Sequence, residues 1–240
     1  MKAAVKIPLV YLLASAAWIG GSDVLSAHFF SSEFAAISLY KGWAFSLLSA
    51  GLLFLLLRRE AGKRDAVETR LRHLAMYDPL TGLLNRASFA ENLDFAVARA
   101  SRDGRRVGVV FVDLDGFKGI NDAYGHHVGD QVLKEVAGRI QRVVRSDDHA
   151  CRFGGDEFVI LFQGEREEGG ERLAERLMEA VQAPVRLDGR TVAVSASVGY
   201  AVYPDHGVLG EDLLRAADLA MYRVKELGKN ATLEAPPFAA

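Results

Sequence analysis

Four acidic side chains near the ends of apolar segments have the spacing of a metal-dependent site. Asp113 and Asp115 close the run Val107–Asp115, and because side chains alternate along a strand, both carboxylates fall on one face. Asp156 and Glu157 directly follow two glycines, a signal for a tight hairpin. Acids that converge in this way need a cation, and Mg²⁺ is usually held by one or two carboxylates plus substrate phosphates. The predicted chemistry is metal-dependent nucleotidyl transfer.

The second of these acidic segments also has an ordinary interpretation. A Gly-Gly-Asp-Glu stretch in isolation is as compatible with a solvated turn as with a functional site, because glycine tolerates positive φ at any turn. The prediction therefore depends on two acidic segments, Val107–Asp115 and Arg152–Phe158, being neighbours in the fold.

Glycine-bearing and positive positions around these acids suit a phosphate. The stretch Gly116–Asp122 follows the acidic strand end, where turn amides can hold phosphate oxygens and Lys118 adds a point charge. Lys225 and Lys229 lie near the end of a predicted helix over Leu213–Leu227, on one face by their i, i+4 spacing. These lysines either stabilise the negative end of that helix or reach a triphosphate.

Asn121 and Asp130 together offer an amide and a carboxylate, the groups that can read a guanine base. Guanine presents an acceptor at O6 and donors at N1 and N2. A carboxylate can accept hydrogen bonds from the donors, while an amide can form hydrogen bonds with the remaining polar edges of the base. The alternatives are local. Asn121 can cap a turn, and Asp130, at the start of a predicted helix over Val128–Val144, favours the helix dipole.

Arg145 and Asp148 follow that helix with a spacing of three. One interpretation is a surface ion pair, which contributes little to stability. The other is a site for an anionic, guanine-bearing ligand, because arginine forks onto phosphate and guanine edges. The sequence alone does not distinguish between these two interpretations.

Apolar spacing predicts the elements that must carry these residues. Helices are expected where apolar residues recur every three or four positions, and strands where they form a continuous or alternating run. The expected helices cover Asn85–Ala100, Val128–Val144, Glu171–Val181 and Leu213–Leu227, and the expected strands include Val107–Asp115, the arms of the Gly-Gly hairpin and Thr191–Ala201.

The N-terminal part of the chain differs in composition from the rest. Two runs, Ile7–Gly21 and Gly42–Leu57, carry no charge, and their extensions approach the roughly 20 apolar residues of a membrane helix. Basic residues precede the first run and follow the second, which favours a hairpin with both ends in the cytoplasm. The competing interpretation is a cleaved signal peptide over residues 1–16.

A charged segment follows, with Val67, Leu71 and Leu74 at helical spacing. It predicts a helical stalk that either pairs in a dimer or lies as a solvated linker. The expected organisation is a membrane anchor over 1–57, with membrane contact through 7–57, a stalk over 58–76, a catalytic domain over 77–232 and a flexible tail over 233–240.

Composition sets the outer limits of these interpretations. At 240 residues with 50% hydrophobic content, the chain can form one sizeable core and an additional element. A net charge of −2 gives no indication of nucleic-acid binding. The single cysteine, Cys151, excludes an internal disulfide and suits a buried apolar role. The six histidines show no zinc spacing.

Longer motifs containing these residues resemble the GGDEF-domain diguanylate cyclases. Several motifs in the right order between Leu74 and Asn230 are far more specific than any one alone. They are Asp78-Pro-Leu-Thr-Gly-Leu-Leu-Asn-Arg86, Phe111-Val-Asp-Leu-Asp-Gly-Phe-Lys118, Asn121-Asp122, Gly125-His126 with Gly129-Asp130, Arg152-Phe-Gly-Gly-Asp-Glu-Phe158 and Ala217-Asp-Leu-Ala-Met-Tyr222.

The resemblance implies an α/β (α+β) domain with a ferredoxin-like palm that condenses two GTP into cyclic di-GMP. It implies Mg²⁺ as the cofactor, with Mn²⁺ as an alternative, and a homodimer in which each protomer holds one GTP. Together with the apolar runs, it predicts a multi-pass protein of the inner membrane with a cytoplasmic catalytic domain and no nucleic-acid partner. The main alternative is a catalytically silent GGDEF domain that binds GTP or cyclic di-GMP; an ATP-using cyclase and a structural membrane adaptor are weaker ones.

The resemblance also assigns roles to individual residues. Asp113 and Asp156 become metal ligands together with the Leu114 carbonyl, and Asp113, Asp156 and Glu157 become the catalytic acids. Lys229 stands where the family commonly has arginine. The remaining roles are guanine recognition by Asn121 and Asp130, phosphate contacts by Gly116, Phe117, Lys118, Lys225 and Lys229, and product inhibition through an RxxD site at Arg145 and Asp148.

Overall fold

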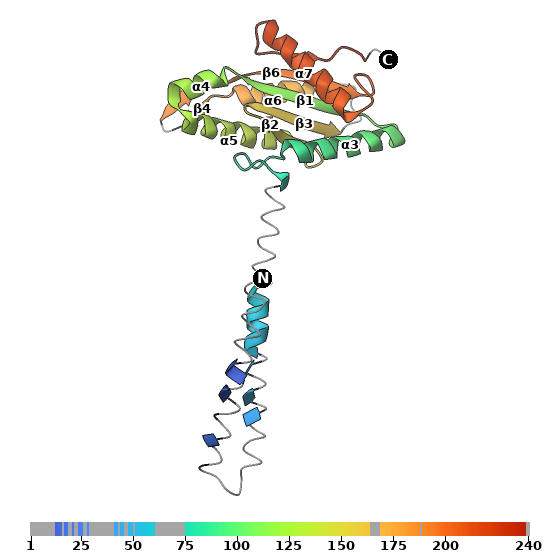
Figure 1. The fold of residues 1–240 in the computed structure, drawn as a ribbon. Coiled ribbons are helices and arrows are strands. Elements are labelled where there is room, and N and C mark those ends of the chain that lie inside the picture. Colours follow the sequence, from blue (N-terminus) through green and yellow to red (C-terminus); the bar gives the residue numbers. More distant parts are fainter. Residues whose placement is uncertain are drawn as a thin grey trace. The chain divides into compact units, whose positions relative to one another are not determined.

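The computed structural model describes residues 75–163, 169–187 and 189–238, together with parts of 13–60. The chain divides into two compact units, Met1–Arg70 and Leu71–Ala240. Each unit is described by itself (Figure 1).

The larger unit is built on a five-stranded sheet with the order β2-β3-β1-β6-β7. Its central strand β1 pairs antiparallel with β3 on one side and with β6 on the other, while β7 runs parallel to β6. The sheet strands are β1 (Val107–Asp115), β2 (His149–Gly154), β3 (Glu157–Gln163), β6 (Ser195–Tyr203) and β7 (Thr232–Glu234). The strand predicted at Val107–Asp115 is confirmed in position and length.

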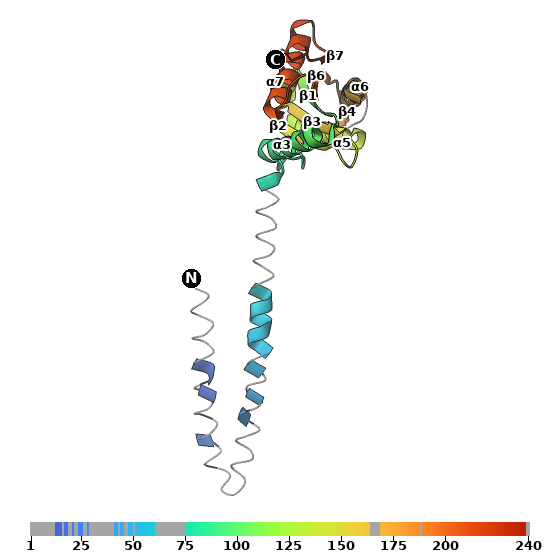
Figure 2. The same cartoon turned by 90° about the vertical axis from the view of Figure 1, so that its right-hand side faces the viewer.

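Helices cover both faces of this sheet, as Figure 2 shows in side view. The helices α3 (Arg86–Asp103) and α7 (Gly210–Glu226) bury their apolar residues in one core. The other core lies against α4 (Phe117–Tyr124), α5 (His126–Val143) and α6 (Gly169–Gln182). The resulting mixed α/β palm agrees with the fold class expected from the resemblance.

The regularly spaced apolar residues that predicted the helices are the residues that the helices bury. In α3, Phe89, Leu93 and Val97 are all buried, and in α5, Val132 and Ile140 are fully buried. Burying a side chain of this size contributes about 1.5–3 kcal/mol, so these residues fix the face that each helix turns to the sheet.

Close contact between α7 and β6 brings the end of α7 to the edge of the sheet. A Cβ atom on Gly199 would lie 2.2 Å from the Ala217 carbonyl oxygen and 2.3 Å from the Met221 amide nitrogen. Only glycine permits this approach, because both neighbouring atoms belong to a helix backbone that cannot yield. The packing determines where the end of α7, which carries Lys225, meets the tip of β1.

Two local predictions were wrong. Thr191–Ala201 is not one strand, because β5 (Arg190–Val192) pairs with β4 (Val185–Leu187) in a separate two-stranded sheet and β6 begins only at Ser195. Val192, Val194 and Ala196 are all buried, so the alternating apolar pattern continues through the break between β5 and β6. The pattern therefore gives no sign of the break.

The stretch after β1 is also not a simple turn. Gly116 has φ 70°, and the chain then enters helix α4, whose Phe117 and Ile120 are buried. Eight residues are too few for periodicity to reveal a helix, and stability in so short a helix comes from tertiary packing. The predicted site residue Asn121 therefore lies on a helix.

The smaller unit contains helical residues from both predicted apolar runs. Residues 51–60 are helical, and the rings of Trp18 and Phe45 stack with their centroids 5.9 Å apart. In the described part of this unit and of the other, no helix combines the length and the apolar character needed to cross a membrane. Much of the predicted anchor over 1–57 and most of the predicted stalk over 58–76 lie outside the described residues.

Candidate active site

Strand pairing brings the two acidic segments together. Asp113 at the end of β1 lies opposite Glu157 at the start of β3. The Leu114 amide donates to the Asp156 carbonyl oxygen over 3.2 Å, which extends the pairing into the hairpin tip. The condition on which the sequence prediction depended, that these segments are neighbours, is met in the fold.

An arginine holds the tip of the hairpin. Gly155 has φ 42°, and its carbonyl accepts hydrogen bonds from Arg152 Nε at 3.0 Å and Nη2 at 2.8 Å. Arg152 Nη1 lies 3.3 Å from both carboxylate oxygens of Asp78. The guanidinium therefore connects the Asp78–Leu84 turn to the backbone beside Asp156. Sequence reasoning missed this role, because nothing local pairs residues so far apart in the chain.

Asp78 should contribute pH-dependent stability through this contact. Partial burial acts to raise its pKa, but hydrogen bonds from Thr81 and the charge of Arg152 outweigh burial and lower the pKa below its ordinary value of 3.8. Stability from a lowered carboxyl pKa is present above the unfolded pKa and is lost as the pH falls through the folded pKa. We expect Asp78→Asn to cost about 1 kcal/mol of unfolding free energy near pH 7.

Denaturant unfolding at several pH values measures this cost. The difference between the wild type and Asp78→Asn should begin to shrink as the pH falls below about 4, because the unfolded carboxyl then takes up a proton and the folded carboxyl follows at lower pH. Asp103→Asn is the matched control, since in the described part of the chain Asp103 pairs with Arg99 in an exposed contact. A cost for Asp78→Asn that stays constant down to pH 2.5, or equals that of the control, would contradict the assignment.

Asp113 is a largely buried carboxylate that is paired with one lysine. Its side chain is only 9% exposed, and Lys225 Nζ lies 2.7 Å from Oδ2. Burial raises the pKa of Asp113, Lys225 acts in the opposite direction, and the charges of Asp156 and Asp115 raise it further; the net pKa is above the ordinary value. Burial and the neighbouring acids therefore outweigh the effect of Lys225 on the pKa of Asp113.

The pKa of Glu157 is raised for similar reasons. Burial raises its pKa, and the nearby charges of Asp113, Asp218 and Asp156 raise it further, against the lowering effect of Lys225. A carboxylate with a raised pKa is a better proton acceptor than an exposed one.

A single pocket of about 310 Å³ collects the metal-side and phosphate-side predictions. Lys229 is not on the helix, as its spacing from Lys225 suggested, because α7 ends at Glu226 and Lys229 has φ 67°. It lines the pocket nonetheless. The full lining is Asp113, Leu114, Asp115, Gly116, Phe117, Lys118, Asp156, Lys225 and Lys229.

The donor set fits a divalent cation that is shared with a ligand. No three histidine, cysteine, aspartate or glutamate side chains in the described part of the chain form a group that could hold a metal by themselves. Two carboxylates, Asp113 and Asp156, share the pocket with the Leu114 backbone. This is the oxygen-rich, incomplete arrangement that Mg²⁺ uses when substrate phosphates supply the remaining ligands.

Asn121 and Asp130 lie beyond this pocket, at the contact between α4 and α5. A Cβ on Gly129 would lie only 1.9 Å from Asn121 Oδ1, so the Asn121 amide rests directly on Gly129. Asp130 is the next residue and is exposed. Because α4 begins beside the phosphate pocket, one turn of helix, about 6 Å of rise, separates the phosphate-side residues Phe117 and Lys118 from Asn121.

Gly129→Ala tests the prediction from the sequence that Asn121 reads a guanine base. The new methyl group forces Asn121 out of its present position, and we expect the KM for GTP to rise about tenfold, the effect of losing one polar contact to a ligand. Steady-state kinetics over a range of GTP concentrations measures the change.

Gly138→Ala is the matched control in the same helix. Its Cβ would meet only Arg142, at 3.6 Å, so it gains the same helix propensity without a clash. Equal KM values for the two alanine variants would show that the contact between Asn121 and Gly129 does not matter for GTP.

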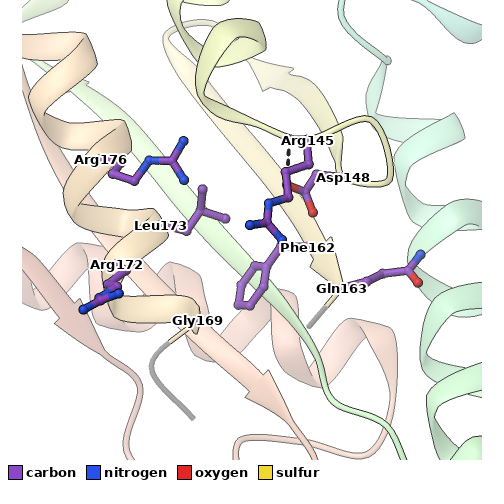
Figure 3. A pocket seen from close by; sticks show the side chains of 8 residues that line it. All are labelled: Arg145, Asp148, Phe162, Gln163, Gly169, Arg172, Leu173 and Arg176. Carbon is purple, nitrogen blue, oxygen red and sulfur yellow. Dashed lines mark hydrogen bonds between the residues drawn. The ribbon is translucent and has the colours of Figure 1, made fainter. Parts of the chain in front are cut away.

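Arg145 and Asp148 border a second pocket of about 160 Å³, between the turn after α5 and the start of α6 (Figure 3). Asp148 Oδ2 accepts a hydrogen bond from the Arg145 amide at 2.9 Å, so the pair is joined through the backbone. The Arg145 guanidinium extends into the pocket, and Arg176 points toward it from α6 while donating to the Val143 carbonyl at 2.8 Å.

The electrostatics of this second pocket differ from those of an exposed ion pair. Burial and the charge of Asp147 raise the pKa of Asp148, against hydrogen bonds and the charge of Arg145 that lower it. Arg172 also lines the pocket. The guanidinium groups of Arg145 and Arg176 both point into this pocket, an arrangement that suits an anion.

Comparison with known proteins agrees with the fold. Residues 75–231 match the family described as "Diguanylate cyclase, GGDEF domain", and the chain belongs to this family. It is 46% identical over 160 residues to the bifunctional diguanylate cyclase/cyclic di-GMP phosphodiesterase MucR of Pseudomonas aeruginosa, covering 67% of this chain but only 23% of MucR.

Solved structures give the same result. The GGDEF domain of TpbB (YfiN) from Pseudomonas aeruginosa has a TM-score of 0.65 and 40% identity, over 66% of this chain and 94% of that one. The coiled coil and GGDEF domain of DgcB from Caulobacter crescentus, solved in complex with c-di-GMP, has a TM-score of 0.67 and 32% identity, over 78% of this chain and 99% of that one.

Proposed function

We propose that this chain is a diguanylate cyclase that joins two GTP molecules into cyclic di-GMP and releases two pyrophosphates. The observation that carries the proposal is the single pocket in which Asp113 and Asp156 meet the phosphate-side residues Lys118, Lys225 and Lys229. Membership of the GGDEF family supports this reaction. Relatives named as diguanylate cyclases and a relative solved with c-di-GMP support it.

The residues of one protomer grip one GTP at both ends. Asn121 and Asp130 receive the guanine edge, and the amides at the start of α4 hold phosphate oxygens together with Lys118. Lys225 and Lys229 neutralise the triphosphate from the other side of the pocket. Holding base and phosphates at once orients the α-phosphate and the 3′-hydroxyl, which lowers the entropic part of the barrier.

Bond formation joins the 3′-oxygen of one GTP to the α-phosphorus of the other, and the bond to pyrophosphate breaks. A bound Mg²⁺, or Mn²⁺ in its place, supplies charge neutralisation on the phosphates and a lower pKa for the attacking hydroxyl. Asp113, Asp156 and the Leu114 carbonyl would hold it. Glu157 accepts the proton that leaves the 3′-hydroxyl.

Each protomer supplies only half of the complete site that this reaction needs. One pocket holds one GTP, so two pockets of a homodimer must face each other, and two such steps close the ring. The rate at low protein concentration should therefore depend on dimerisation, through the stalk over 58–76 or the anchor over 1–57. Diffusion of two free protomers into register would be slow without such a link.

Incubation of the full chain with Mg²⁺ and GTP, followed by chromatographic separation of the nucleotides, tests the proposal. Cyclic di-GMP and pyrophosphate in a 1:2 ratio are expected, with ATP giving no cyclic product. Binding of GTP or cyclic di-GMP without any turnover would instead identify a catalytically silent GGDEF domain.

The pocket at Arg145 supports product inhibition as part of the proposal. Arg145→Ala should relieve inhibition by added cyclic di-GMP and raise the half-inhibitory concentration at least about tenfold, because a fork-like contact to an anionic group is lost. Initial rates at increasing cyclic di-GMP measure this. Arg142→Ala, which replaces an exposed arginine in the last turn of α5, is the control. An unchanged inhibition curve for Arg145→Ala would count against the site.

The membrane location rests on the sequence. Two uncharged runs with basic outer flanks support an inner-membrane anchor over 7–57, with the catalytic domain in the cytoplasm. The stacking of Trp18 on Phe45 is compatible with two adjacent helices. Fractionation of cells that express the full chain tests this: recovery in the membrane fraction after a high-salt wash is expected, and recovery in the soluble fraction would contradict it.

A further inference from the structure

Asp115 lines the phosphate pocket but has its own set of partners. One carboxylate oxygen, Oδ1, accepts from the Ser197 hydroxyl at 2.8 Å. The other, Oδ2, accepts from the Ser195 hydroxyl at 3.2 Å and from the Asn230 backbone amide at 3.3 Å. Both oxygens are therefore engaged by β6 and by the turn that follows α7, which separates Asp115 from the two carboxylates assigned to the metal.

The turn that Asp115 contacts has an unusual backbone. Lys229 and Asn230 have φ values of 67° and 55°, a left-handed conformation that residues other than glycine adopt rarely and at a cost. Such a conformation persists only where its surroundings hold it. The Lys229 amide donates to the Val224 carbonyl at 2.9 Å, and Gln182 Nε2 donates to Asn230 Oδ1 at 2.7 Å.

We propose that Asp115 is a positioning residue that acts through Lys229. Its hydrogen bond to the Asn230 amide fixes the left-handed turn, and the turn places Lys229 at the phosphate pocket although α7 has already ended. The inference rests on the proposed function, because it assumes that the pocket receives the phosphates of GTP. In this proposal Asp115 acts by holding the turn that carries Lys229, and its negative charge is not required.

The geometry gives distinct expectations for different substitutions. Asp115→Ala removes the acceptor for the Asn230 amide, so the turn can relax and withdraw Lys229. Asp115→Asn removes the negative charge but can keep the geometry, because its amide oxygen can accept from Ser195 and Asn230 while its NH₂ group donates to Ser197. A metal ligand or an electrostatic residue would lose its function in both variants.

The test is a double-mutant cycle on the full chain with GTP and Mg²⁺. We expect Asp115→Ala and Lys229→Ala each to raise the KM for GTP about tenfold with a smaller change in kcat, as the loss of one charge-assisted phosphate contact predicts. The double variant should be no worse than either single one, because both changes remove the same contact. Asp115→Asn should stay within about threefold of the wild type.

Binding without turnover gives a second readout. In a Glu157→Gln background, Asp115→Ala should weaken GTP binding and leave GMP binding unchanged, if Lys229 contacts the β- and γ-phosphates that GMP lacks. Thermal melting checks folding. If Asp115→Ala does not fold, Asp115→Ser, which is too short to reach Asn230, and Gln182→Ala, which removes the other anchor of the turn at an exposed position, replace it in the cycle.

Each outcome decides the inference. Additive effects of the two substitutions, an Asp115→Asn variant as impaired as Asp115→Ala, or an equal loss of GTP and GMP binding would overturn it while leaving the proposed function intact. A wild-type chain that binds no GTP would overturn both.

Discussion

Asp113→Asn should lower the rate of cyclic di-GMP formation at least about a hundredfold, because metal-ion stabilisation of phosphoryl transfer is worth several kcal/mol. The carboxylate is the more buried of the two assigned to the metal, and burial together with the charges of Asp156 and Asp115 raises its pKa in spite of Lys225. An amide has nearly the same shape but donates from one atom and carries no charge. The initial rate of product formation at saturating GTP measures the effect.

A folding control separates this effect from general damage. Asn should make the folded protein no less stable, since the ionised carboxylate is itself costly to bury at this position. Asp103→Asn, far from the site and exposed, should leave the rate unchanged. If Asp113→Asn formed product at a near-normal rate, the metal assignment would have to be abandoned.

Glu157→Gln should produce a comparably large loss, but of a different kind. Glu157 lies opposite Asp113 on the neighbouring strand and has a raised pKa from burial and from the acids around it. As the proton acceptor for the 3′-hydroxyl it acts in the transition state, so we expect kcat to fall by about 10²–10⁴ while the KM for GTP changes little.

The split between kcat and KM distinguishes this role from substrate binding. Gly129→Ala, which disturbs the base-binding residue Asn121, is expected to show the opposite pattern, a raised KM with a smaller change in kcat. A Glu157→Gln variant with normal kcat, or with a raised KM alone, would remove Glu157 from the catalytic step.

Much of the fold followed from patterns that act over short distances. The strand that ends in Asp113 and Asp115 was predictable because the six residues before the first acid, 107–112, are all apolar or glycine. The Gly-Gly hairpin was predictable because positive φ at its tip, 42° at Gly155, is a property of glycine itself. Most helices were predictable because their buried faces repeat every three or four residues.

The remaining features depend on contacts between distant residues. Helix α4 is stabilised by burying Phe117 and Ile120 against another part of the core. The contact of Asn121 with Gly129 and the bridge from Arg152 to Asp78 exist only once the chain has folded. Lys229 reaches the pocket from a left-handed turn, which its spacing from Lys225 on a supposed helix could not indicate.

Divalent-cation titration tests the central claim most directly, with Mn²⁺ as a paramagnetic probe followed in the presence and absence of GTP. The account predicts saturable binding that is much tighter with GTP present, and that is lost in both Asp113→Asn and Asp156→Asn but retained in Asp103→Asn. Mn²⁺ binding that GTP does not strengthen, or that survives both substitutions, would contradict it.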